Sequence, residues 1–115
     1  MRIAIDAMGS DSAPLPEVKG AVEASLREKD LQVILVGDEN LLASELDKFP
    51  TRGNVEILHA AQAITMNDSP VQAVRQKKDS SLLVGMRMVK KGEADAIVSA
   101  GNTGAVQVAA RIVLG

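Results

Sequence analysis

Four short runs of β-branched and aliphatic residues, separated by segments of helical periodicity, constrain the fold of this 115-residue chain more than any other feature. None of the runs alternates strictly between apolar and polar residues, which predicts strands covered on both faces, as in a parallel sheet. The runs are residues 2–6, 32–36, 55–58 and 95–99. Strands that alternate with helices in this way predict an α/β fold, a doubly wound domain with a mostly parallel sheet.

The segments between the runs predict four helices. Pro16 suits the first turn of the first helix, where a missing N–H costs little. Asp38 is a capping residue for the second, which is expected to end before Pro50. The first helix is expected to bury one face, made by Val18, Ala21, Val22, Ser25 and Leu26. The last two helices are expected at about residues 80–91 and from residue 102 onward.

The segment 59–79 is longer than an ordinary connection, and excursions of this size are often functional. A short helix beginning at Pro70 is expected within it. The chain has the length of one domain and an ordinary globular composition, 46% apolar and 24% charged. Because it stops inside a helical pattern, we expect residues 1–115 to be the N-terminal part of a larger α/β catalytic domain.

Composition argues against several classes of function. The absence of cysteine excludes a disulfide and a thiol nucleophile and fits a cytoplasmic protein. A single histidine without cysteines argues against a metal site. A net charge of −2 and one aromatic residue argue against nucleic-acid binding. The apolar stretch 94–115 contains Asp95 and Arg111, each costing about 2.5–3.5 kcal/mol at mid-bilayer, so a transmembrane helix is rejected. No signal peptide precedes Asp6.

Loops that follow the predicted strands lie where α/β sheets bind ligands, at the carboxyl edge. In the loop after the fourth strand, Gly101 and Gly104 allow close approach of backbone, and Asn102 and Thr103 add donors. The next helix aims its free N–H groups at the same place, which favours an anion such as phosphate. A helix cap flanked by turn glycines explains the same residues, and both interpretations stay open.

Other candidates have a plain alternative each. The loop after the first strand has only Gly9 of a G-x-G-x-x-G pattern, which argues against a nicotinamide cofactor. His59, at a strand end, is either structural or catalytic. The basic run Arg75, Lys77 and Lys78, with Lys90 and Lys91 beyond it, is either a solvated face or a contact for phosphate or an acidic partner.

Residues 6–11 read Asp-Ala-Met-Gly-Ser-Asp. They resemble the D-A-M-G-G-D opening of the phosphate acyltransferase family of bacterial phospholipid synthesis, with Ser10 where the family usually has glycine. The stretches 35–38, 59–60, 64–70, 75–81 and 94–105 are similar to the same family, in the same order. Together they span almost the whole chain and form a highly specific pattern.

This resemblance implies an enzyme that transfers a fatty acyl group from acyl carrier protein to inorganic phosphate, without a cofactor. It implies a three-layer fold related to isocitrate dehydrogenases, in a homodimer. It also implies peripheral association with the inner face of the membrane through regions outside this chain. Two alternatives remain: a fragment of an isocitrate-type NAD-dependent dehydrogenase, and a non-catalytic module that binds a carrier protein.

For the acyl transfer we hypothesise direct attack by phosphate on the thioester, so the protein supplies positioning and charge stabilisation. Asp6 would order its loop, and either His59 or Lys78 would stabilise the oxyanion or the leaving thiolate. Arg75 and Lys77 would dock the partner. The residues expected to hold phosphate are Gly9, Ser99, Asn102, Thr103 and Gly104.

Overall fold

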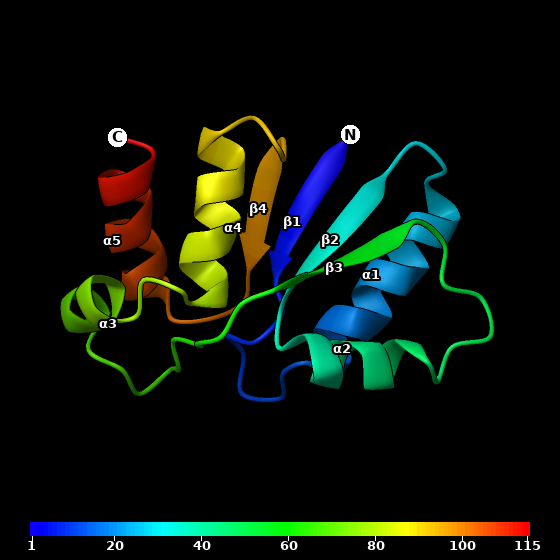
Figure 1. Cartoon of the computed structure of the whole chain (residues 1–115), viewed down its shortest axis with the longest axis horizontal. Helices are drawn as coiled ribbons and strands as arrows, with labels where there is room; N and C mark the ends of the chain where they lie inside the picture. Colours follow the sequence, from blue (N-terminus) through cyan, green and yellow to red (C-terminus); the bar gives the residue numbers. More distant parts are fainter.

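The computed structural model describes all residues, 1–115, as one parallel sheet with helices on both faces (Figure 1). The strand order is β3-β2-β1-β4, and every neighbouring pair is parallel. The strands are β1 (Arg2–Asp6), β2 (Gln32–Gly37), β3 (Val55–His59) and β4 (Ala96–Ser99). The helices are α1 (Leu15–Arg27), α2 (Glu39–Leu46), α3 (Pro70–Gln76), α4 (Ser81–Lys90) and α5 (Thr103–Val113). The predicted α/β class is confirmed, and the closer relation to isocitrate dehydrogenases stays a prediction.

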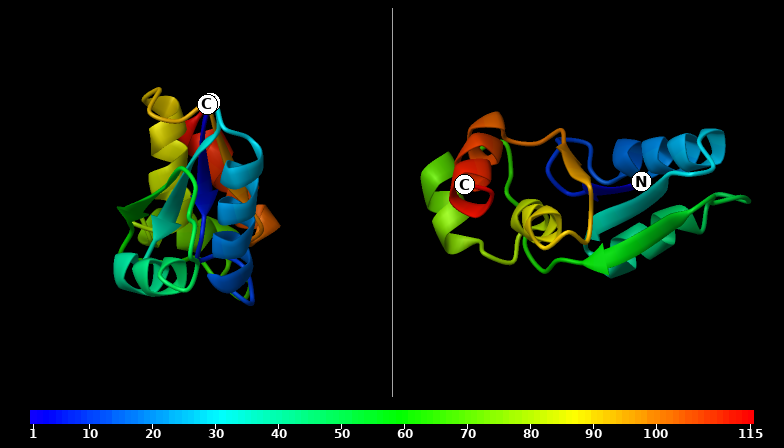
Figure 2. Two further views of the ribbon diagram at one scale, coloured as in Figure 1. Left: turned by 90° about the vertical axis from the view of Figure 1, so that its right-hand side faces the viewer. Right: turned by 90° about the horizontal axis from the view of Figure 1, so that it is seen from above.

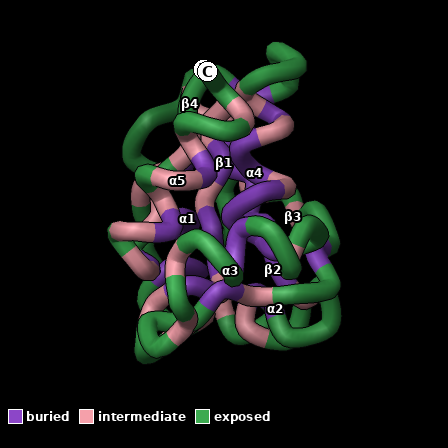
Figure 3. The backbone as a smooth tube through the Cα atoms, turned by 90° about the vertical axis from the view of Figure 1, so that its left-hand side faces the viewer, coloured by how far each residue is buried: buried purple, intermediate pink, exposed green.

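Strand β2 is buried on both faces because its side chains enter two different hydrophobic clusters. Val33 and Leu35 pack with α1 and α2, whereas Ile34 and Val36 pack with α4. Figure 2 shows this separation from above, with α1 and α4 on opposite sides of the strands. A third cluster joins α3, α4 and α5 at one end of the molecule, and Figure 3 shows its buried segments from that end.

The expectation that all four strands are covered on both faces is wrong for the two edge strands. Leu58 of β3 is 39% exposed and Val98 of β4 is 53% exposed. The reason is geometric: α4 packs on β1, β2 and β4, whereas α1 and α2 pack on β2 and β3. One face of each edge strand is therefore left without a helix.

Most helix signals in the sequence act as expected. The Asp38 carboxylate accepts hydrogen bonds from the amides of Asn40 and Leu41, which caps α2. Gly92, with a φ of 78°, follows the end of α4. The short helix predicted at Pro70 is α3. One expectation is wrong, because Leu26 is 46% exposed instead of facing inward from α1.

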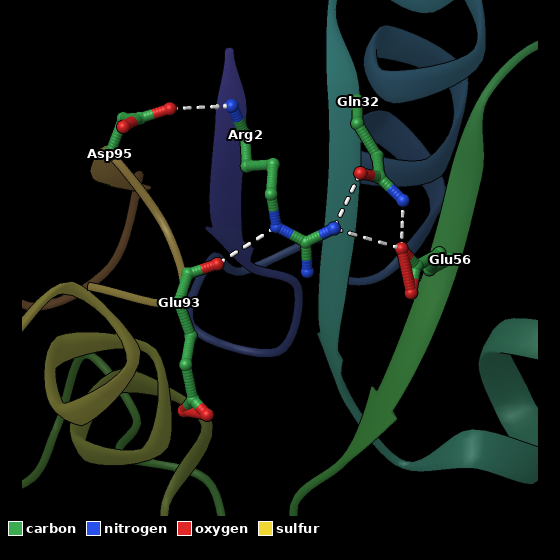
Figure 4. Close-up of polar contacts among 5 residues, drawn as sticks. All are labelled: Arg2, Gln32, Glu56, Glu93 and Asp95. Atoms are coloured by element: carbon green, nitrogen blue, oxygen red, sulfur yellow. Dashed lines mark hydrogen bonds and ion pairs between the residues drawn. The ribbon is translucent and has the colours of Figure 1, made fainter. Parts of the chain in front are cut away.

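The amino edge of the sheet is closed by hydrogen bonds around Arg2 (Figure 4). Its guanidinium donates to the carbonyl of Glu93 at 2.8 Å, and also to Gln32 and Glu56. Its backbone amide donates to Asp95 at 2.8 Å. The polar groups at this edge are thus occupied with one another.

The carboxyl edge is arranged differently because the chain changes face between β1 and β4. Helix α1 leaves β1 on one face, and α4, which leads to β4, lies on the other. A change of this kind separates the loops that follow the two strands and is the usual ligand site of open α/β sheets. None of the helices combines the length and apolar character required to cross a bilayer.

Candidate functional site

Asp6 is the centre of a hydrogen-bond network where β1, β4 and α4 meet. It pairs in register with Ser99 at the ends of adjacent strands, and it is only 3% exposed. One carboxylate oxygen accepts from the Ser81 hydroxyl at 2.5 Å and the other from the Ser99 hydroxyl at 2.9 Å. The amide of Met8 also donates to it. Charge-assisted bonds of this kind compensate for burying a carboxylate.

The loops after β1 and β4 touch through glycines. A β-carbon on Gly9 would lie 2.7 Å from a carboxylate oxygen of Asp6 and 3.2 Å from the Cα of Gly101. A β-carbon on Gly101 would lie 3.1 Å from the Cα of Gly9. Both positions therefore require glycine for close approach of backbone. We call Asp6, Gly9, Ser81, Ser99 and Gly101 the loop junction.

Helix α5 begins directly after this junction. The Asn102 side chain accepts from the amide of Ala105, so it caps the helix, and its nitrogen donates to the carbonyls of Thr65 and Asp68. The amides of Thr103 and Gly104 have no acceptor within the chain, and Thr103 is exposed. Two free donors and the positive end of an 11-residue helix thus face the carboxyl edge.

Gly104 has a packing reason of its own, because a β-carbon there would lie 2.7 Å from the ring of Pro70. This contact sets the first residue of α3 against the first turn of α5. None of the cavities in the chain is lined by residues 102–104. A cavity of about 250 Å³ lies between α1 and β4 and is lined partly by Ser10 and Ala100, from the loops that follow β1 and β4.

The excursion, residues 59–79, is braced internally by polar contacts. Asp68 accepts from the Lys77 ammonium at 2.7 Å and from the Thr65 amide at 2.9 Å. The hydrogen bond from Lys77, reinforced by that from Thr65, lowers the pKa of the Asp68 carboxyl below its usual range. Lys77 also donates to the carbonyl of Ala63. The positive charge of Lys77 is therefore paired within the excursion.

The two residues expected to stabilise the oxyanion lie away from the loop junction. His59 ends β3, two strands from β1 and so roughly 10 Å across the sheet. Its Nδ1 accepts from the amide of Glu39 at 3.2 Å, a contact at the start of α2. Lys78 is exposed and lines a groove with Arg75 and Arg87, apart from the residues expected to hold phosphate.

Reasoning from the sequence missed the role of Ser81 and the contact that Ser10 makes with Glu17. Ser81 was expected only to begin a helix, and its bond to Asp6 depends on a contact between residues 75 positions apart. Ser10 donates its hydroxyl to Glu17 at 2.5 Å, so its side chain turns toward α1. The other oxygen of Glu17 is buried without a partner. Only the placement of α1 against the loop reveals this pair.

Comparison with known proteins gives the context of these loops. The model of the family described as "Fatty acid synthesis protein" matches residues 1–115. The chain belongs to this family. It is 51% identical to the phosphate acyltransferase of Koribacter versatilis over 98% of this chain and 32% of the relative. It is 49% identical to that of Syntrophomonas wolfei and 47% identical to that of Alkaliphilus oremlandii, over 100% of this chain and 36% and 34% of the relatives.

The resemblance to phosphate acyltransferases that was predicted from the sequence is therefore confirmed. The chain spans about a third of the length of the curated relatives it matches. The stretches that carried the resemblance include both loops of the junction, residues 6–11 and 94–105, and the excursion that Asn102 holds in place.

Proposed function

We propose that the protein carrying this chain is a phosphate acyltransferase, which transfers a fatty acyl group from acyl carrier protein to inorganic phosphate. Membership of the fatty acid synthesis family and the shared name of the relatives support the reaction. The observation that carries the site is the pair of free amides, Thr103 and Gly104, beside the loop junction. A phosphate at a helix start of this kind accepts hydrogen bonds and meets the positive end of the helix.

In the proposed reaction a phosphate oxygen attacks the thioester carbonyl carbon. The new C–O bond forms as the C–S bond breaks, and the thiolate leaves on the carrier protein. The products are acyl phosphate and free carrier. Phosphate is already an anionic nucleophile, so the protein acts by holding it in position and by compensating charge.

The residues of the junction act on phosphate mostly through the backbone. The Thr103 hydroxyl and the amides of Thr103 and Gly104 would donate to it. Asp6 would fix the ends of β1 and β4, and with them Gly9 and Ser99. The Asn102 side chain is committed to the helix cap and the excursion, so its contribution would be to position α5. The remaining walls of the site would come from the rest of the enzyme.

The positions of His59 and Lys78 give no support to a role for either in stabilising the oxyanion, and the proposal does not depend on them. The dehydrogenase alternative gains no support either, since the loop after β1 offers Gly9 alone to a dinucleotide.

The test uses the full-length enzyme with acyl carrier protein as donor and measures acyl phosphate formation against phosphate concentration. Thr103→Val removes one donor, and Asn102→Asp keeps the cap acceptor but removes the nitrogen that donates to Thr65 and Asp68. Each should raise the KM for phosphate about 10-fold, the effect of about 1.4 kcal/mol of lost binding. Gln107→Ala, on the exposed side of α5, is the matched control.

Phosphate dependence that stays the same in both variants would contradict the assigned site. Absence of acyl phosphate with every acyl thioester, despite binding of the carrier protein, would instead support a non-catalytic binding module.

A further inference from the structure

Helices α3, α4 and α5 form a groove whose rim is cationic. It has a volume of about 330 Å³. The residues that line it are Val74, Arg75, Lys78, Leu83, Arg87, Ile112 and Val113. We call this set the basic groove. It lies at the end of the molecule where these three helices gather (Figure 1).

The cations of the basic groove are largely unpaired. Arg75 and Lys78 have no carboxylate within ion-pair distance, and Arg87 has only Asp79 at 4.0 Å, whose side chain is 77% exposed. Three positive charges therefore line one groove of a chain whose net charge is −2. Lys77, the neighbour in sequence, turns the other way and pairs with Asp68.

The floor of the basic groove is apolar. Val74 and Leu83 are buried at 4% and 3% exposure, and Ile112 on the opposite wall is 60% exposed. A groove with an apolar floor and a cationic rim is complementary to an amphipathic helix that carries acidic residues beside its apolar ones. A membrane surface suits it less, because interfacial binding uses apolar side chains that project into the lipid, whereas this floor is recessed.

The basic groove is also close to the proposed phosphate site. Helix α3 begins at Pro70, against Gly104 in the first turn of α5, and its last turn carries Arg75. Seven helical residues span roughly 10 Å. A partner bound in the groove would thus lie about one short helix away from the free amides of α5.

We propose that the basic groove docks an acidic amphipathic helix of the protein that delivers the acyl group. This inference rests on the proposed function. The charges of Arg75, Lys78 and Arg87 steer the acidic partner and set its orientation, and Ile112 supplies an apolar contact. The docking residues expected from the sequence were Arg75 and Lys77. In this proposal Lys78 and Arg87 take the place of Lys77 beside Arg75.

The test compares two acyl donors in the full-length enzyme: acyl carrier protein and a small acyl thioester of N-acetylcysteamine. The double variant Arg75→Glu, Arg87→Glu should raise the KM for the carrier-bound donor at least 10-fold. It should leave the KM for the small donor and for phosphate within twofold. Its KM for the carrier should also depend less on salt than that of the parent. The control is Lys90→Glu, Lys91→Glu, which reverses two exposed charges outside the groove.

An equal rise in the KM for both donors, or the same rise in the control variant, would contradict docking of the carrier protein in the basic groove. An unchanged KM for the carrier-bound donor, together with weaker binding of the double variant to vesicles of anionic lipid, would also contradict it. That result would indicate that the cations contact a membrane surface. If no donor yields acyl phosphate, the proposed function is wrong. Titration with carrier protein then still tests whether the basic groove binds it. Weaker binding by the Glu variant would support it and unchanged binding would overturn it.

Discussion

The loop junction and the basic groove use polar side chains in opposite ways. At the junction the Asp6 carboxylate is buried and both oxygens accept from serine hydroxyls. In the groove, Arg75 and Lys78 are exposed and have no carboxylate partner. A buried, satisfied group fixes the backbone around it, whereas exposed, unpaired charges act on what arrives from outside.

This difference predicts that substitutions will separate into two classes. Changes at the junction should lower the free energy of unfolding and also raise the KM for phosphate. Changes in the groove should leave stability almost untouched and alter only association with an acidic partner.

The largest effect is expected for Asp6→Ala. The substitution removes the acceptor of Ser81 and Ser99 and leaves two hydroxyls without their partner, one of them fully buried. Losing hydrogen bonds to a charged group should lower the free energy of unfolding by about 2–4 kcal/mol. Urea denaturation of the full-length protein measures this loss.

Two controls sharpen the comparison. Asp11→Ala removes an exposed carboxylate from the same loop, and Arg75→Ala removes a cation of the basic groove; each should change stability by less than about 0.5 kcal/mol. A loss from Arg75→Ala as large as that from Asp6→Ala would contradict the distinction between the two regions.

The same two regions show what could be predicted from the sequence. The strands, the caps at Asp38 and Asn102 and the helix at Pro70 follow from local patterns, because each depends on neighbours a few residues away. The carboxyl edge was also predictable, since parallel strands place their loops on one side.

The partners of those loops were not predictable, because they depend on long-range packing. Ser81 reaches Asp6 only once α4 lies across β1. The basic run divides because α3 turns Lys77 toward Asp68 and leaves Lys78 beside Arg87. Val98 is exposed because no helix covers that face of β4, which its apolar sequence does not reveal.

A smaller effect is expected for Gly9→Ala. The added β-carbon would lie 2.7 Å from Asp6 and 3.2 Å from Gly101, so one loop must shift. Overpacking of this kind should cost about 1–3 kcal/mol and should raise the KM for phosphate as the loops separate. Ala100→Ser, an addition of one atom at an exposed neighbour, is the control. If the free energy of unfolding and the KM for phosphate equal those of the parent, the close contact between the two loops is not required for stability or for phosphate binding.

The smallest effect concerns the excursion, where Asp68 joins Lys77 to the loop that Asn102 holds. The pKa of Asp68 is lowered in the folded protein, so the carboxylate contributes stability above its unfolded pKa, about 3.9. That contribution is lost as the pH falls through the lower, folded pKa. The melting temperature of Asp68→Asn should therefore lie slightly below that of the parent from pH 7 to pH 5, and the difference should shrink as the pH falls below about 4, toward the folded pKa. A difference that does not shrink as the pH is lowered below about 4 would show that the Asp68 charge does not hold Lys77, and would leave the contacts of Asn102 as the principal link between the excursion and the site.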